Sequence, residues 1–262
     1  MDSIARAALT RTYPHHRWRH VATNRTRLWA LEGAPALYVN IARISDSLEP
    51  GLSPMAEADR TRWLSAQGVP CPEVVDAGLI DDEEYLVTGA VPGRPLPEFA
   101  SDADYIDIVD EVARTVSRLH RIPLDECPFD RRLRVTIPMA QEAAGLGEVD
   151  LAGFGGRAMT TTTLVTELLA KARLVGREEP VVCHGNLSAD NILIDPDTRR
   201  VAALLGAARC GVADRYVDLA KTTAGLNEVF DRDAAKRFIY RYGENPVDPE
   251  RLDFYRLLDR FW

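Results

Sequence analysis

The segment that most constrains this chain covers residues 178–209 and reads EEPVVCHGNLSADNILIDPDTRRVAALLGAAR. Short apolar runs lie on both sides of the polar loop HGNLSADN, and a third apolar run follows the turn residues Asp195-Pro196-Asp197. This order predicts a strand, a loop, a second strand, a turn and a third strand. Loops that strands hold in place often carry functional residues, so we expect a site here.

The first part of the chain alternates apolar and polar residues as strands do. Residues 27–44 alternate on both sides of Glu32-Gly33, which predicts a hairpin, and residues 69–93 predict two more short strands. Between them, residues 53–67 have apolar side chains at helical spacing, begin with Ser-Pro and end before a glycine. Residues 1–92 are therefore predicted to form a small, mostly β lobe with one helix.

The rest of the chain has mainly helical patterns. Residues 104–120 place their apolar side chains on one face of a helix, and residues 158–171 and 249–262 also predict helices. The fold class is therefore predicted to be α+β with two lobes. The β-rich lobe covers residues 1–92, and the mainly helical lobe covers residues 93–262.

Composition excludes several classes of protein. The net charge of -8, with no basic run, argues against a nucleic-acid partner. No apolar run approaches the roughly 20 residues that span a bilayer, and the first residues do not read as a signal peptide. The four cysteines form no CxxC pair, which favours reduced thiols over a metal site. We expect a cytoplasmic protein with no membrane partner; the oligomeric state stays open.

The loop HGNLSADN at residues 184–191 resembles the H-G-D-x-x-x-x-N loop of antibiotic phosphotransferases, which are similar in fold to protein kinases. Further segments along most of the chain resemble aminoglycoside 3′-phosphotransferases: YPHH at 13–16, EADR at 57–60, LVT at 86–88, AVPG at 90–93, CPFDRRL at 127–133, GVADRY at 211–216 and FYRLLD at 254–259. The resemblance implies a protein-kinase-like fold with a β-rich N-lobe and a helical C-lobe.

The same resemblance implies where the catalytic and metal-binding groups should lie. The position of the catalytic base is Asn186, whose neutral amide cannot accept a proton near pH 7. One metal ligand is retained as Asn191, but the position of the second, an aspartate in the family, is Gly206. No carboxylate occurs between Val201 and Cys210, so a shift in the alignment does not restore the ligand. An amide alone is a poor magnesium ligand.

The nucleotide-binding positions differ from the family pattern as well. The strand lysine that pairs with the phosphates is replaced by Asn40, while its partner carboxylate corresponds to Glu57. The loop that covers the phosphates, residues 22–28, contains no glycine. Arg25 and Arg27 are the remaining cations in that loop that could touch a phosphate. We therefore expect no cofactor, with binding of ATP and magnesium weak or absent.

The substrate positions implied by the resemblance have also changed. The family meets the ammonium groups of aminoglycosides with carboxylates from an insertion and from the end of the chain. The insertion here, residues 150–157, has one acid and ends in Arg157. At the end of the chain the acid Asp259 is followed by Arg260 and by Trp262. Arg260 places a cation where the family has a carboxylate.

Two other residues in the loop are candidates for chemistry. His184 is either a general acid or base or a structural histidine, and we favour the structural interpretation. Asp190 is a candidate substitute base, although the loop pattern directs its side chain elsewhere.

Three hypotheses of function follow. The first is a pseudoenzyme that does not transfer phosphate and binds an aminoglycoside-like, aminocyclitol or other sugar-like molecule, or a partner protein, in antibiotic resistance or biosynthesis. The second is a non-phosphoryl enzyme, an eliminase or isomerase of an aminoglycoside intermediate, which would use His184, Asp190 and Asp259. The third is a weak ATP-dependent aminoglycoside 3′-phosphotransferase.

Overall fold

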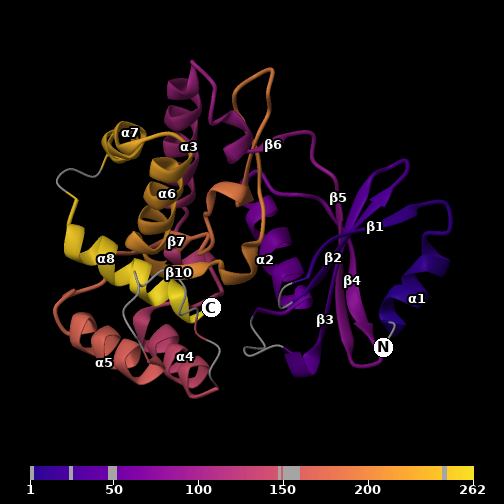
Figure 1. The fold of residues 1–262 in the computed structure, drawn as a ribbon, viewed down its shortest axis with the longest axis horizontal. Helices are drawn as coiled ribbons and strands as arrows, with labels where there is room; N and C mark the ends of the chain where they lie inside the picture. Colours follow the sequence, from indigo (N-terminus) through magenta and orange to yellow (C-terminus); the bar gives the residue numbers. More distant parts are fainter. Residues whose placement is uncertain (1–2, 24–25, 47–51, 147–148, 150–159, 244–246) are drawn as a thin grey trace. The chain divides into compact units, whose positions relative to one another are not determined.

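The computed structural model describes residues 3–23, 26–46, 52–146, 149, 160–243 and 247–262 (Figure 1). The chain forms two compact units. Unit 1 consists of Met1–Pro95 and Asn191–Arg209, and unit 2 consists of Leu96–Asp190 and Cys210–Trp262. The predicted boundary between the lobes lies between residues 92 and 93, which places residues 191–209 in the second lobe. In the structure this segment joins unit 1 because its strands pair with Arg94–Pro95 and the Leu204 amide donates to the Pro70 carbonyl.

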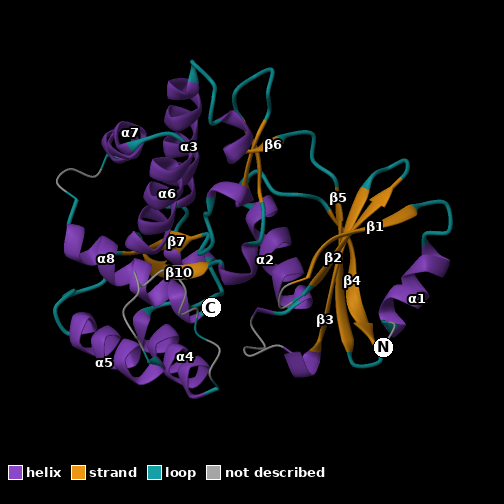
Figure 2. Ribbon diagram, in the orientation of Figure 1, coloured by secondary structure: helices purple, strands orange, loops and turns teal. Residues whose placement is uncertain are grey.

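The main sheet of unit 1 has five antiparallel strands in the order β1-β2-β3-β5-β4 (Figure 2). Its strands are β1 (Arg17–Thr23), β2 (Arg27–Glu32), β3 (Leu37–Arg43), β4 (Val74–Ile80) and β5 (Glu83–Gly89). The predicted hairpin is confirmed as β2–β3, and the two further predicted strands are confirmed as β4 and β5, which pair with each other. Asp81, in the second turn, has a φ of 60°, a region that Asp enters more readily than most residues.

Two α-helices belong to unit 1, so the prediction of a single helix was wrong. The predicted helix is α2 (Pro54–Ala66), and its N-cap Ser53 accepts a hydrogen bond from the Ala56 amide. The additional helix is α1 (Ile4–Thr12), which buries Ala5 and Leu9 in the core of the unit beside Leu31, Leu37 and other sheet residues. Its small apolar face gives a weak helical pattern in the sequence, so tertiary packing determines this helix.

A second, three-stranded sheet in unit 1 has the order β6-β8-β9. It contains β6 (Arg94–Pro95), β8 (Ile192–Ile194) and β9 (Val201–Leu204). The predicted turn between β8 and β9 is confirmed, and the Asp195 carboxylate accepts hydrogen bonds from the amides of Asp197 and Thr198, both at 2.9 Å. This sheet positions Asn191 and Gly206, which flank the β8–β9 hairpin.

Unit 2 is mainly helical around one short pair of strands. Its helices are α3 (Tyr105–Leu119), α4 (Leu133–Gly145), α5 (Thr161–Ala172), α6 (Tyr216–Val229), α7 (Arg232–Tyr242) and α8 (Pro249–Leu258). The antiparallel pair is β7 (Pro180–Cys183) and β10 (Gly211–Asp214). Short 3-10 helices connect these elements. Unit 1 contains η1 (Ile44–Asp46) and η6 (Ala207–Arg209), and unit 2 contains η3 (Leu96–Phe99), η4 (Leu124–Glu126) and η7 (Asp259–Phe261). The remaining one, η5 (Ala189–Asn191), spans the boundary between the units in the sequence.

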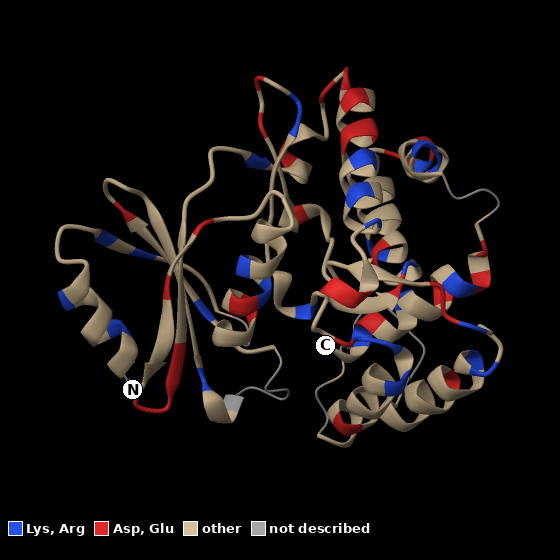
Figure 3. Cartoon of the chain, turned by 180° about the vertical axis from the view of Figure 1, so that it is seen from behind, with Lys and Arg blue, Asp and Glu red and all other residues tan. Residues whose placement is uncertain are grey.

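The helices predicted at residues 104–120 and 249–262 are confirmed as α3 and α8, the latter continuing into η7. The helix predicted from residue 158 is confirmed as α5 from Thr161 onward, while residues 158 and 159 lie outside the described residues. Acidic and basic residues are interspersed over these helices (Figure 3). Within the described residues, no helix combines the length and the apolar character needed to cross a membrane.

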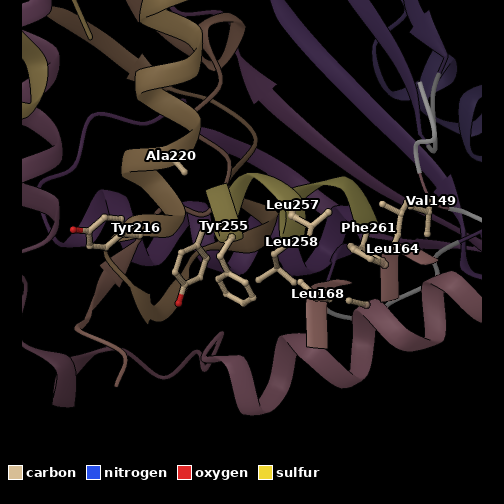
Figure 4. Close-up of a cluster of buried hydrophobic side chains, with 11 residues drawn as sticks. Val149, Leu164, Leu168, Tyr216, Ala220, Tyr255, Leu257, Leu258 and Phe261 are labelled. Atoms are coloured by element: carbon tan, nitrogen blue, oxygen red, sulfur yellow. The ribbon is translucent and has the colours of Figure 1, made fainter. Parts of the chain in front are cut away.

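A core cluster in unit 2 fixes the end of the chain. It joins side chains of α5, α6 and α8 with Phe261 of η7 (Figure 4). Leu258 and Phe261 are 4% and 0% exposed, and between them lie Asp259 and Arg260. Because both flanking side chains are buried, the backbone that carries Asp259 is held in place.

Candidate functional site

The polar loop of unit 2 is held by one buried carboxylate. The backbone amides of His184 and Gly185 each donate to Asp218 of α6 at 2.8 Å, and His120 Nε2 lies 3.0 Å from the same carboxylate. Burial alone would raise the pKa of Asp218, but the His120 hydrogen bond, neighbouring charges and the Gly185 amide lower this pKa below its ordinary value. Asp218 therefore stays ionised and fixes the start of the loop to α6.

His184 is completely buried in this loop. Its Nδ1 accepts the Asn186 amide at 3.3 Å, and its Nε2 has no hydrogen-bond partner among the described residues. Burial lowers the pKa of His184 to about 4, and the nearby Lys221 ammonium lowers it further while Asp218 opposes the shift. A neutral, enclosed imidazole that supports the Asn186 backbone has the features of a structural histidine.

The two other candidate residues of the loop are Asn186 and Asp190. Asn186 is partly buried and carries a neutral amide, whereas Asp190 is exposed at the start of η5. The loop therefore presents no carboxylate at the position where the resemblance implies a base.

The two metal positions lie together in unit 1. The Leu205 amide donates to the Asn191 carbonyl at 2.8 Å, and Ile192 of β8 pairs with Leu204 of β9. Gly206, which follows directly, has a φ of 70°. Two neighbouring positions thus offer one amide and no carboxylate, and magnesium prefers carboxylate and other hard oxygen ligands. The residues at these positions do not fit a magnesium ion.

One cluster of metal-ligand type occurs among the described residues, namely His120, Cys183 and Asp218 in unit 2. His120 Nδ1 lies 2.7 Å from the Tyr242 hydroxyl, its Nε2 faces Asp218, and both Asp218 oxygens accept backbone amides. These ligand atoms already have protein partners, and the cluster serves as the anchor of the loop.

The nucleotide positions in unit 1 have an acid without its cation. Asn40 lies on β3, and its buried Oδ1 has no hydrogen-bond partner among the described residues. Glu57 lies in the first turn of α2, and burial raises its pKa to about 7. Among the described residues no basic side chain forms an ion pair with Glu57. Burial without a neighbouring cation disfavours the ionised form of Glu57, which is why its pKa is raised.

Arg27, a candidate phosphate contact, is bound elsewhere. Its guanidinium forms an ion pair with Glu83, which is 2% exposed. Glu83 also accepts the Ser3 hydroxyl at 2.7 Å and the Ala5 amide at 2.9 Å. Arg27 thus connects β2 to the start of α1 through a buried carboxylate. The other candidate, Arg25, lies outside the described residues.

At the substrate positions of unit 2, Asp259 has an internal partner. Lys221 Nζ of α6 lies 2.9 and 2.8 Å from the two carboxylate oxygens of Asp259. Trp262 packs near Arg131, whose guanidinium carbon lies 5.6 Å from the ring centroid. Arg260 is partly buried next to Asp259, and Arg157 lies outside the described residues.

Sequence reasoning did not identify Lys221 or the anchoring role of Asp218. A signal was present, because the two residues are three apart on one helix and therefore lie on the same face. Asp259, however, is 38 residues further along the chain, so its pairing with Lys221 is visible only in the folded unit.

Known proteins resemble this chain over nearly its whole length. The sequence pattern of the phosphotransferase enzyme family matches residues 19–255. An aminoglycoside 3'-phosphotransferase of Streptomyces fradiae is 37% identical over 270 residues, covering 98% of this chain and 99% of the relative.

Two solved structures agree with the fold. An aminoglycoside-3'-phosphotransferase of type VIII has a TM-score of 0.88 at 34% identity and covers 98% of both chains. An aminoglycoside phosphotransferase of Streptomyces rimosus, in complex with ADP and streptomycin, has a TM-score of 0.84 at 29% identity and covers 100% of both chains. The predicted kinase-like α+β fold, with a β-sheet N-lobe and a helical C-lobe, is confirmed.

Proposed function

The chain belongs to the aminoglycoside phosphotransferase family, and from this premise we propose that it binds a small molecule without transferring phosphate to it. One observation carries the proposal. Uncharged residues, namely Asn186, Gly206 and Asn40, stand at three positions where phosphoryl transfer in this family uses charged groups. The proposed ligand is an aminoglycoside-like, aminocyclitol or other sugar-like molecule, and the proposed setting is antibiotic resistance or biosynthesis.

Phosphoryl transfer depends on positioning and on neutralising charge, so these losses act on its main requirements. A single transition-state arginine in GTPases contributes about 10³- to 10⁵-fold to the rate. Here the base, one metal ligand and the phosphate-binding cation are all replaced. Removal of several such groups is expected to lower the rate of transfer below detection.

The state of Glu57 supports weak or absent binding of ATP and magnesium. Its carboxyl has a raised pKa and, among the described residues, no basic partner. Asn40 on β3 has a buried Oδ1 that accepts no hydrogen bond from the described residues. A triphosphate is polyanionic, and a lysine ammonium would neutralise part of its charge, whereas the neutral amide of Asn40 and the carboxyl of Glu57 bring no positive charge to these positions. This lack of a cation supports weak or absent binding of ATP.

The relatives support a small-molecule ligand. The Streptomyces rimosus phosphotransferase has been solved with streptomycin and ADP, and it covers this chain completely. Net negative charge and the absence of a basic run give no support to a nucleic-acid partner. We therefore propose a ligand with the ring and hydroxyl pattern of an aminoglycoside.

The other two functions receive less support. A non-phosphoryl enzyme would need His184 or Asp259 as an acid or base, yet the first is enclosed with a pKa of about 4 and the second is paired with Lys221. A weak kinase would need a metal ligand that neither Asn191 nor Gly206 supplies well.

Titration calorimetry of the whole chain tests the proposal. The ligands tested are streptomycin, 2-deoxystreptamine and a neutral cyclitol. We expect at least one of them to bind, and we expect its affinity to be the same with and without magnesium-ATP. We expect magnesium-ATP alone to give no heat of binding up to millimolar concentration. Tight binding of magnesium-ATP, or formation of ADP in the calorimeter cell, would overturn the proposal.

A further inference from the structure

Lys221 and Asp259 form an ion pair that is held in place from both sides. The two Nζ–O distances are 2.9 and 2.8 Å, and the side chains are 20% and 36% exposed. Lys221 follows the buried residues Leu219 and Ala220 of α6, and Asp259 follows buried Leu258. Exposed ion pairs gain little because two mobile side chains must be ordered. Here the Lys221 side chain is only 20% exposed and both residues follow buried neighbours, so packing limits the motion of the two charged groups and favours a preformed pair.

This pair lies beside the polar loop. The hydroxyl of Thr222, the residue after Lys221, donates to the Leu187 carbonyl of the loop at 3.4 Å, and the Lys221 ammonium lowers the pKa of His184. Lys221 is also one helical turn after Asp218, which holds the His184 and Gly185 amides. Lys221 and Asp259 therefore belong to the same part of unit 2 as the loop that ends in Asp190.

We propose that Lys221 acts as an internal ammonium group that occupies Asp259, and that it thereby sets the charge of the ligand that unit 2 accepts. Because Lys221 Nζ contacts both Asp259 oxygens and neutralises the carboxylate, an ammonium group of a ligand competes with a cation that is already in position. The favoured ligand is neutral or weakly basic and rich in hydroxyl groups, such as a cyclitol, and not a polycation. This inference rests on the proposed function, since it names the ligand class of the same site.

The Lys221 ammonium competes strongly with a ligand ammonium for Asp259, because Lys221 is part of the same chain. A group attached through a short linker acts at an effective concentration of the order of millimolar or higher. An external ammonium must exceed that concentration or bring other contacts to displace Lys221. Arg260, adjacent to Asp259 and partly buried, adds positive charge and further disfavours a polycationic ligand.

The experiment compares Lys221→Met with the wild-type chain. Methionine keeps a similar unbranched side chain and removes the ammonium group. The matched control is Lys236→Met, which removes an exposed lysine that pairs with Asp233 on α7 of the same unit. Thermal unfolding identifies any variant that fails to fold. The ligands are 2-deoxystreptamine, which carries two amines, and scyllo-inositol, which carries none.

For Lys221→Met we expect the affinity for 2-deoxystreptamine to rise about 10-fold and the affinity for scyllo-inositol to stay within about twofold. Lys236→Met is expected to change neither. The inference would be overturned if Lys221→Met bound 2-deoxystreptamine with the same affinity as the wild-type chain or with a lower one. It would also be overturned if 2-deoxystreptamine bound neither the wild-type chain nor Lys221→Met.

A second readout does not depend on a ligand. Since the Lys221 ammonium lowers the pKa of His184, Lys221→Met should raise this pKa, as followed by NMR of the imidazole ring. A His184 pKa that does not rise would contradict the placement of Lys221 beside the loop. Measuring ADP in the same samples separates the two proposals, because phosphate transfer by the wild-type chain would refute the proposed function without altering the affinity comparison.

Discussion

At the scale of the residue, charge is the property in which the proposed function differs from phosphoryl transfer. Asn40 is neutral at the position where the resemblance implies a lysine, and Glu57 has a raised pKa and no basic partner among the described residues. The positions themselves were predictable from the sequence, since the motifs around them are intact. Their electrostatic state was not, because it depends on how deeply α2 packs against the sheet.

The raised pKa of Glu57 predicts a pH-dependent loss of stability. Its pKa is near 4.5 when the chain is unfolded and about 7 when it is folded, so the folded chain holds this proton more tightly than the unfolded chain. The free energy of unfolding is therefore highest below pH 4.5, where Glu57 is protonated in both states, and it falls as the pH rises to about 7. We expect Asn40→Lys to supply a cation and reduce this loss, which is about 1–3 kcal/mol in the wild-type chain.

Urea unfolding at pH 4.5 and pH 7 measures this effect. Glu57→Gln serves as the matched variant, because it removes the titrating group and should abolish the same part of the pH dependence. Identical pH dependence in the wild-type chain, Asn40→Lys and Glu57→Gln would show that Glu57 is not the group that titrates.

At the scale of the element, buried carboxylates fix the segments that surround the candidate positions. Asp218 ties the polar loop to α6, and Glu83 ties Arg27 of β2 to the start of α1. The sequence predicted the strands and α2 because alternation and the Ser53 cap are local signals. It did not predict α1 or these links, because both arise from contacts between distant residues.

Substitution of Glu83 by Gln should loosen α1. Arg27 would lose its partner carboxylate, and the Ser3 hydroxyl and Ala5 amide would lose a charged acceptor. We expect a cost of about 2–4 kcal/mol in the free energy of unfolding, together with faster amide exchange in α1. Glu32→Gln is the control, because Glu32 pairs with Arg17 and Arg19 on an exposed edge, where solvent screens ion pairs, and the substitution should cost much less stability than Glu83→Gln. Equal costs for the two variants would contradict the structural role of Glu83.

Substitution of Asp218 by Asn should release the polar loop. The amide keeps one acceptor oxygen but loses the charge that binds two backbone amides and His120. We expect destabilisation of about 2–4 kcal/mol and faster hydrogen exchange of the His184 and Gly185 amides. The control Asp253→Asn removes an exposed carboxylate paired with Arg256 and should leave both amides protected. Unchanged exchange at His184 and Gly185 in Asp218→Asn would exclude Asp218 as the anchor.

At the scale of the whole molecule, the fold is that of the phosphotransferase family, and Asn186, Gly206 and Asn40 are neutral at positions where the resemblance implies charged groups. The order of motifs from residue 13 to residue 259 was sufficient to predict the kinase-like fold, and structures covering the whole chain confirm it. The proposed replacement of the base, the metal ligand and the phosphate-binding lysine rests on the motifs in the sequence and needs no structure. The pairing of Lys221 with Asp259 could not, because it depends on how α6 and the end of the chain pack.

A single-turnover assay of phosphate transfer tests the central claim most directly. The wild-type chain, in excess over labelled ATP with magnesium, is incubated with streptomycin or 2-deoxystreptamine and compared with Asn40→Lys/Asn186→Asp/Gly206→Asp. Aspartate is a suitable replacement for Gly206 because it tolerates a positive φ better than most residues. We predict no labelled product from the wild-type chain and a magnesium-dependent product from the triple variant. Magnesium-dependent phosphorylation of either ligand by the wild-type chain would contradict the account.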